Sequence, residues 1–151
     1  MEINGIAHVM ITVASLRRSR AFYSKLLPLL GMKAVMDTPE IYYCVGGRTA
    51  FGLRECDAAH RDERFEQQRV GLHHVCFRAR EREDIDLLHD RLWDMSARII
   101  RAPREDAWAP GYYSVLFEDP DGIRLEMNYV PGKGLLAEEV STAVESEEKV
   151  W

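Results

Sequence analysis

The chain carries one pattern twice, and this duplication constrains its fold more than any other feature. Residues 7–14 read AHVMITVA and residues 73–80 read HHVCFRAR, and both segments alternate as half-buried strands do. Apolar residues at helical spacing follow each segment, over 22–30 and 85–95, and three short strand-like segments follow each helix. The sequence therefore predicts two copies of a strand-helix-strand-strand-strand module.

The boundaries of the two modules can be read from the turn residues and the charged stretches. Ser15 is the expected N-cap of the first helix, Gly31 its stop, and Gly46-Gly47 and DPDG (119–122) are expected turns. We expect a single domain over residues 1–133 and a C-terminal tail over 134–151. Within the domain, the first module covers about 4–56, a charged linker 57–69 and the second module about 70–130.

Composition narrows the class of protein. The formal charge of −5 and the pI near 5.6 argue against a nucleic-acid partner, which needs clustered positive charge. Apolar runs fall far short of the ~20 residues that cross a bilayer, and the N-terminus lacks the basic start of a signal peptide. Three cysteines without a CxxC pair fit reduced thiols, so we expect a cytoplasmic protein that contacts no membrane.

Two histidines and one glutamate occupy the strand faces that lie opposite the apolar stripes. His8 and His74 hold matching positions in the two modules, and each faces away from the apolar side of its strand. In the last strand Glu126 likewise faces away from Leu125 and Met127. Two imidazoles and one carboxylate form a facial set that holds a divalent metal and leaves positions open for substrate. The sequence therefore predicts His8, His74 and Glu126 as metal ligands.

These motifs resemble the vicinal oxygen chelate superfamily, which includes glyoxalase I, extradiol dioxygenases, fosfomycin-resistance transferases and bleomycin-binding proteins. The resemblance lies in AHVMITV, LHHVCFRA and FEDPDGIRLEMNY, and it covers roughly residues 4–130. It implies an α+β fold in which two βαβββ modules pair into a cupped, incomplete mixed β-barrel with the helices outside. It also implies one metal ion in the cup and a homodimer, with the modules pairing within one chain or between chains.

Departures from the family pattern bear on the reaction. Gly52 aligns with Glu126, so the fourth ligand of glyoxalase I is missing, and Glu55 is a weaker candidate in another register. Leu116 stands where extradiol dioxygenases usually carry an acid/base tyrosine, ten residues before the metal glutamate. The polar loops of the fosfomycin enzymes are not recognisable, whereas bleomycin-binding relatives lack the ligands that this chain keeps.

The expected protein is a metal-dependent enzyme acting on a small oxygen-chelating metabolite. A lyase or isomerase working through a metal-stabilised enolate is favoured, with Glu126 also able to act as a base, as the resemblance to glyoxalase I implies. The alternatives are an extradiol-type dioxygenase and a drug- or metabolite-binding resistance protein without turnover. His-His-Glu suits Fe, Mn, Ni, Co or Zn. No organic cofactor site is expected.

Five further side chains are candidates for substrate contact. The two arginines share strand faces with proposed ligands and can bind anions by forked hydrogen bonds, whereas the aromatic residues can wall an apolar pocket. They are Arg78, Arg124, Trp108, Tyr112 and Tyr113. His73 lies on the opposite face from His74 and is expected to be a packed or edge residue.

Overall fold

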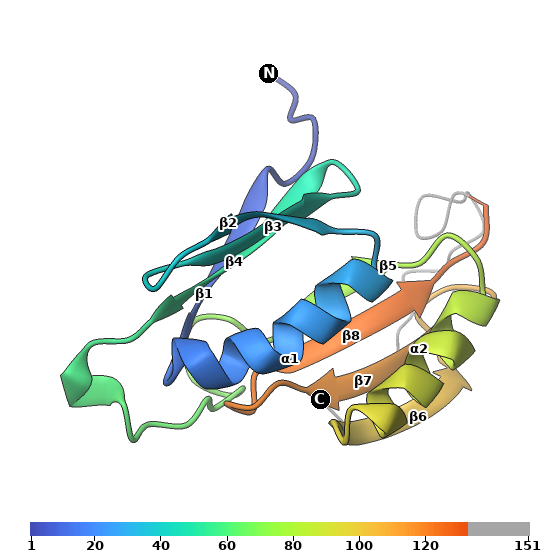
Figure 1. Cartoon of the computed structure of the whole chain (residues 1–151). Helices are drawn as coiled ribbons and strands as arrows, with labels where there is room; N and C mark the ends of the chain where they lie inside the picture. The colour runs from blue at the N-terminus through green and yellow to red at the C-terminus, as the bar shows by residue number, and fades with distance from the viewer. Residues whose placement is uncertain (133–151) are drawn as a thin grey trace. The chain divides into compact units, whose positions relative to one another are not determined.

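The computed structural model describes residues 1–132, which fall into two compact units (Figure 1). The first unit comprises Met1–Val70 together with Asp119–Ile123, and the second comprises Gly71–Glu118 and, among the described residues, 124–132. The predicted linker thus groups with the first unit, and the predicted tail over 134–151 lies outside the described residues. No helix within residues 1–132 has the length and apolar content needed to cross a bilayer.

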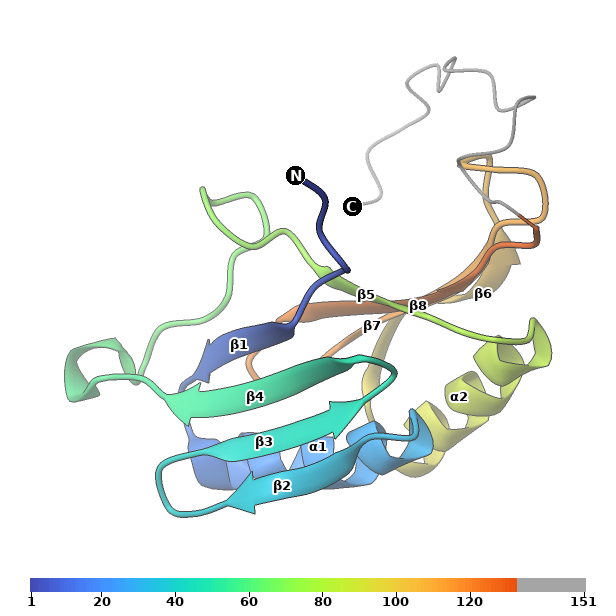
Figure 2. The ribbon, with the colours of Figure 1, turned by 90° about the horizontal axis from the view of Figure 1, so that it is seen from above.

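The first unit is one βαβββ module with a four-stranded sheet. Its elements are β1 (His8–Val13), α1 (Leu16–Leu29), β2 (Lys33–Asp37), β3 (Tyr42–Gly46), β4 (Thr49–Glu55) and the short 3₁₀ helix η1 (Ala58–His60). The strand order is β1-β4-β3-β2, which can be followed in Figure 2. β1 pairs with β4 in parallel, and the other pairs are antiparallel.

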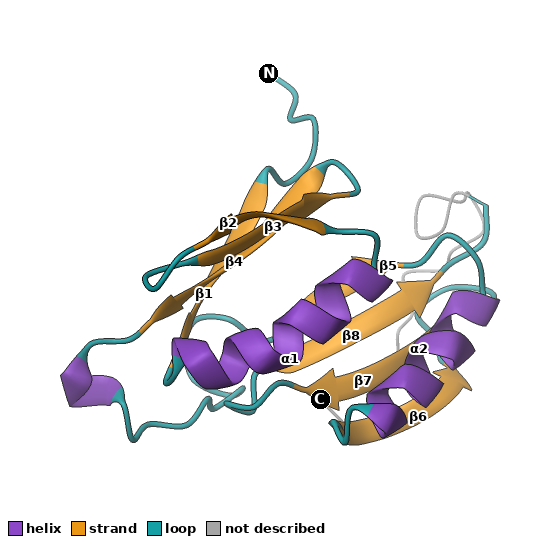
Figure 3. Cartoon of the chain, in the orientation of Figure 1, coloured by secondary structure: helices purple, strands orange, loops and turns teal. Residues whose placement is uncertain are grey.

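The second unit repeats this plan. Its elements are β5 (Val75–Arg78), α2 (Glu83–Asp94), β6 (Arg98–Glu105), β7 (Tyr113–Glu118) and β8 (Arg124–Tyr129). The order β5-β8-β7-β6 again has one parallel pair, β5 with β8 (Figure 3). The predicted α+β class and the two βαβββ modules are therefore confirmed.

Each helix buries its apolar stripe against the sheet of its own unit, as the sequence periodicity predicts. In β1 the side chains of Ile11 and Val13 are buried while His8, Met10 and Thr12 are exposed. Helix α1 packs on β3 and β4, and α2 packs on β6, β7 and β8. α2 buries Ile85, Leu88 and Leu92 of the predicted pattern over 85–95. In α1 Tyr23 is fully buried, whereas Phe22, which begins the predicted pattern over 22–30, is half-buried.

Three side-chain oxygens accept hydrogen bonds from backbone N–H groups at and just before the start of α1. The predicted N-cap Ser15 accepts a hydrogen bond from the backbone N–H of Arg18, and Glu55 Oε2 accepts one from Leu16 at 2.8 Å. Asp121 Oδ2 accepts from the N–H of Ala14 at 2.8 Å, and Asp121 also pairs with Arg18. Because the first N–H groups of a helix have no partner within it, the Ser15 and Glu55 oxygens fix where α1 begins, and Asp121 binds the residue just before the N-cap.

Two turns between strands lie at or next to their predicted positions. The β3–β4 turn falls at Gly47 and Arg48, both with positive φ, one residue beyond the predicted Gly46-Gly47 pair. In the 119–122 turn, Asp119 Oδ1 accepts from the N–H groups of Asp121 and Ile123, and Oδ2 accepts from the Tyr23 hydroxyl at 3.0 Å. Burial raises the pKa of Asp119 to about 6 against the effect of these bonds. The predicted turn-forming role of Asp119 is confirmed.

Candidate functional site

The two sheets place Gly52 and Glu126 at equivalent positions. In the first unit Met10 pairs with Gly52 across β1 and β4, and in the second Cys76 pairs with Glu126 across β5 and β8. His8 and His74 each stand two residues before the paired residue, although β5 begins at Val75, so His74 lies just ahead of its strand rather than in it. The predicted alignment of Gly52 with Glu126 is therefore confirmed by the strand registers.

Glu126 presents its two carboxylate oxygens to different partners. The side chain is 1% exposed. Oε1 accepts a hydrogen bond from the Tyr112 hydroxyl at 2.9 Å, whereas Oε2 lies 3.4 Å from Nε2 of His74. Burial by itself raises the pKa of this carboxyl, but hydrogen bonds from His74, Ser114 and Tyr112 outweigh it and lower the pKa. Glu126 is therefore a buried, ionised carboxylate with one oxygen turned toward an imidazole.

His73 fixes the ring of His74 from the other side. The two Nδ1 atoms lie 2.7 Å apart, and the rings meet edge to face with centroids 5.0 Å apart. One of these nitrogens must carry the proton that joins them. Burial lowers the pKa of His73, and the neighbouring His74 and Arg124 lower it further. With Nδ1 engaged in this way, His74 turns Nε2 toward Glu126. His73, expected to be a packed or edge residue, is half-buried just ahead of the edge strand β5 and also contacts the His74 ring.

The donor atoms of His74 and Glu126 fit a shared divalent metal ion. Two ligand atoms that each lie about 2.1 Å from one ion stand roughly 3.0–3.4 Å apart, depending on the angle between the bonds. The separation of 3.4 Å between Nε2 and Oε2 falls at the upper end of that range. Within neither unit do three His, Cys, Asp or Glu side chains converge among residues 1–132. Two of the three predicted ligands thus lie together in the second unit, and His8 belongs to the first.

Of the predicted aromatic contacts, Tyr112 lies beside Glu126, Trp108 packs against the cluster that contains Tyr112, and Tyr113 faces elsewhere. Tyr112 is 7% exposed and packs in a cluster with Ala109 and Val130, against which the half-buried Trp108 rests. Tyr113 instead donates a hydrogen bond to Asp86 of α2 at 2.6 Å. Tyr113 therefore faces the helix side of its sheet, and Tyr112 supports the Glu126 carboxylate.

The two predicted arginine contacts also differ. Arg124 is half-buried, and its Nε donates to Glu118 Oε1 at 2.8 Å. Its guanidinium is therefore already paired with the neighbouring strand β7. Arg78 at the end of β5 is exposed. Of the two, Arg78 has the more open surroundings for an anionic ligand.

Arg101 is a component of this site that the sequence pattern did not indicate. Its side chain is 7% exposed, with Nη1 2.6 Å from Asp106 Oδ2 and Nη2 donating to Ser114 Oγ at 2.8 Å. Nη2 also lies 3.7 Å from Oε1 of Glu126. Irregular pairing between β6 and β7 on both sides of Arg101 changes the alternation of β6 there. The only sequence signal is a charged residue following Ile99 and Ile100 in a strand-like segment.

The position opposite Gly52 is filled by other side chains of the first unit. A Cβ atom on Gly52 would lie 2.3 Å from Sδ of Met10 and 2.6 Å from Cδ2 of Tyr43. The Tyr43 ring also meets the His8 ring edge to face, with centroids 6.4 Å apart. Glu55, the weaker candidate for a fourth ligand, holds the N–H of Leu16 and pairs with Arg61 at 3.2 Å. A thioether and a phenol ring thus stand where a fourth carboxylate would lie.

Replacing Gly52 with glutamate is expected to destabilise the protein without tightening metal binding. Insertion of a side chain into filled space costs roughly 1–3 kcal/mol, because Met10 and Tyr43 must move. The double variant M10A/G52E removes the thioether and is expected to recover part of that stability. Thermal unfolding and metal titration of both variants measure these effects. A tenfold gain in metal affinity in G52E alone would contradict the expectation.

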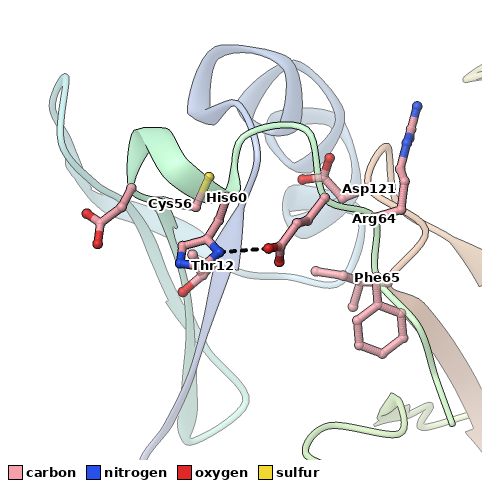
Figure 4. A pocket seen from close by; sticks show the side chains of 9 residues that line it. Thr12, Cys56, His60, Arg64, Phe65 and Asp121 are labelled. Atoms are coloured by element: carbon pink, nitrogen blue, oxygen red, sulfur yellow. Dashed lines mark hydrogen bonds and ion pairs between the residues drawn. The ribbon is translucent and has the colours of Figure 1, made fainter. Parts of the chain in front are cut away.

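A separate pocket of about 360 Å³ lies within the first unit (Figure 4). Its lining includes Thr12, Cys56, His60, Arg64, Phe65 and Asp121. At its rim Nδ1 of His60 lies 2.8 Å from Oε1 of Glu63, and this contact raises the pKa of His60 and lowers that of Glu63. Arg64 donates to the carbonyl of Pro120 at 3.1 Å. His60, Glu63, Arg64 and Asp121 in this pocket therefore each have a partner among their neighbours.

Comparison with known proteins identifies the family. Residues 5–127 match the model of the Glyoxalase/Bleomycin resistance protein/Dioxygenase superfamily, and the chain belongs to this superfamily. It is 26% identical over 121 residues to the uncharacterised protein YqjT of Bacillus subtilis, covering 80% of this chain and 94% of that protein.

Solved structures agree with this assignment. A suspected glyoxalase from Bacillus halodurans superposes with a TM-score of 0.74 at 28% identity, covering 83% of this chain and 96% of that one. A glyoxylase/bleomycin resistance protein/dioxygenase domain from Frankia gives 0.69 at 27% identity, covering 85% and 98%. Lactoylglutathione lyase from Agrobacterium tumefaciens, at 19% identity and 0.61 over 85% and 96% of the two chains, shares the fold.

Proposed function

We propose that this protein is a divalent-metal-dependent enzyme that acts on a small metabolite with two adjacent oxygen atoms. The metal would be held by His74 and Glu126 of the second unit and by His8 of the first, from the same chain or from a second copy in a homodimer. The observation that carries the proposal is the buried, ionised Glu126 carboxylate whose Oε2 faces Nε2 of His74 at 3.4 Å. Membership of the superfamily supports it, because its members generally bind a divalent metal.

A metal in this position would supply Lewis-acid polarisation of the substrate oxygens. The protein side chains perform the rest. His73 holds the His74 ring through Nδ1, and Tyr112 holds Oε1 of Glu126, so both ligands are oriented before any substrate arrives. Three protein ligands leave coordination positions for two substrate oxygens, and the exposed Arg78 is a candidate contact for an anionic substituent.

Lyase or isomerase chemistry next to a carbonyl is favoured over ring cleavage. Leu116 pairs directly with Glu126 across β7 and β8 and is fully buried, so an apolar side chain stands at the position expected for an acid/base tyrosine. The Tyr112 hydroxyl comes close to the ligand set but is committed to Glu126. The second unit thus places an apolar residue at the tyrosine position and commits the nearest phenol to the Glu126 ligand.

The proposal is tested by elemental analysis of the purified protein followed by metal removal and reloading. We expect about one divalent ion per site of three ligands, and activity that returns with metal on a panel of α-hydroxy carbonyls and 2-acyl thioesters. Failure of the wild-type protein to bind any of Fe, Mn, Ni, Co or Zn would refute the metal assignment. Metal-dependent binding of a panel compound without turnover would instead identify a binding protein.

A further inference from the structure

We propose that Tyr112, supported by Arg101 and Ser114, is a positioning residue that keeps Glu126 a fixed ligand through Oε2 alone. This inference rests on the proposed function, because it concerns how the ligand is presented to the metal. It also changes the expected role of Glu126. A carboxylate fixed at Oε1 stays in place during turnover, whereas the sequence resemblance had allowed it to leave and act as a base.

The Tyr112 hydroxyl is built into the protein interior. Its ring is 7% exposed and packs with Ala109, Val130 and Trp108, so its direction is set by packing rather than by Glu126. Gly111, with a φ of +72°, precedes it, and a Cβ there would lie 2.8 Å from Pro131. The close approach of the Pro131 ring to Gly111, together with the positive φ of Gly111, thus restrains the loop that carries the hydroxyl 2.9 Å from Oε1.

Arg101 places a positive charge on the same side of the carboxylate. Its guanidinium is held by Asp106 at 2.6 Å and by Ser114 at 2.8 Å, and it lies 3.7 Å from Oε1. Because both partners are nearly excluded from water, the attraction between Arg101 and Glu126 is weakly screened. Rotation of Glu126 toward a substrate would break the Tyr112 bond and leave the buried Arg101 with less negative charge nearby.

Oε2 has a different set of neighbours. It faces Nε2 of His74 at 3.4 Å, whereas the Tyr112 hydroxyl and the Arg101 guanidinium lie on the Oε1 side. One oxygen is therefore the anchored end of the carboxylate and the other is the ligand end. Outer-shell partners of this kind typically change metal affinity by about 10–100-fold when they are removed.

The test compares Tyr112→Phe with Tyr113→Phe. Each change removes one phenol hydroxyl and keeps the ring, but the Tyr113 hydroxyl bonds Asp86 on the helix side of the sheet. In Mn(II) and Co(II) titrations we expect Tyr112→Phe to raise Kd about 10–100-fold and Tyr113→Phe to leave it unchanged. Metal-loaded crystals are expected to show Glu126 bound through Oε2 in the wild type and through both oxygens, or rotated, in Tyr112→Phe.

Ser114→Ala is the second variant, because with little change in volume it removes a hydroxyl that accepts from Arg101 and also hydrogen-bonds Glu126. We expect a smaller rise in Kd that is not additive with the loss of Tyr112, since both act on one carboxylate. Equal Kd values for Tyr112→Phe and Tyr113→Phe, or a wild-type crystal with Oε1 on the metal, would overturn the inference. A wild-type protein that binds no metal would refute the proposed function instead.

Discussion

Replacement of His74 with alanine is expected to lower the affinity for divalent metal more than roughly 100-fold, since even outer-shell partners cost 10–100-fold. His74 supplies the imidazole nitrogen that faces Oε2 of Glu126, and no other histidine of the second unit points there. The folded protein should survive, because His74 is half-buried at the start of β5 and lies outside the apolar stripe that packs on α2. Isothermal titration with Mn(II) and thermal unfolding of the metal-free protein measure the two effects.

His60→Ala is the matched control for this prediction. His60 is also an imidazole beside a glutamate, at 2.8 Å from Glu63, but both side chains are more than half exposed. The His60→Ala variant should leave metal affinity unchanged. His8→Ala is expected to behave like His74→Ala if His8 completes the site. Retention of a full equivalent of tightly bound metal in His74→Ala or in His8→Ala would show that the replaced histidine is not a ligand.

The Fe(II)-loaded protein is expected to cleave catechols at least 10²-fold more slowly than an enzyme with a positioned proton-transfer group, which contributes about 10²–10⁴-fold. Ring cleavage requires protons to move between the catechol, an oxygen species and the opened product. Leu116 can neither give nor take a proton, and it is the residue paired with Glu126. Tyr112 does not replace it, because burial and the Glu126 charge raise the pKa of the Tyr112 hydroxyl and its hydrogen is donated to Oε1.

The measurement is anaerobic loading with Fe(II), followed by exposure to oxygen and a panel of substituted catechols, with the yellow ring-opened product followed by absorbance. Fe(II)-treated His74→Ala protein reports the background from free iron. Cleavage by the wild type at ordinary enzyme rates, well above this background, would place dioxygenation ahead of lyase or isomerase chemistry. Absence of product together with metal-dependent turnover of an α-hydroxy carbonyl would support the proposed ordering.

Strand alternation made much of the fold predictable. The period of two separates Ile11 and Val13 from His8 and Met10, and this separation is what the burial of β1 shows. The duplicated pattern also aligned Gly52 with Glu126, because both modules have one parallel pair in the same place in their strand order. Local periodicity carries this information without any knowledge of long-range contacts.

The details around Glu126 depend on features that periodicity does not encode. The pairing irregularities on both sides of Arg101 shift the alternation of β6, so an arginine enters the interior. Tyr112 and Tyr113 are neighbours with opposite roles because β7 begins only at Tyr113. The sequence places two tyrosines in this segment, but the residue at which the strand starts decides which one reaches the carboxylate.

The equivalent parallel strand pairs, β1–β4 and β5–β8, carry different residues at the position of Glu126. This difference indicates that the two modules took on different roles after duplication. In the β5–β8 pair, Glu126 contacts Tyr112, Arg101 and His74, so changes to these partners would harm the ligand. At the β1–β4 pair, Gly52 lies under Met10, a flexible and polarisable side chain that is 39% exposed. Substitutions at Met10 can therefore reshape the surroundings of His8 while the Glu126 ligand stays intact. A library at Met10 and Tyr43 is the natural starting point for evolving new substrate ranges on this scaffold.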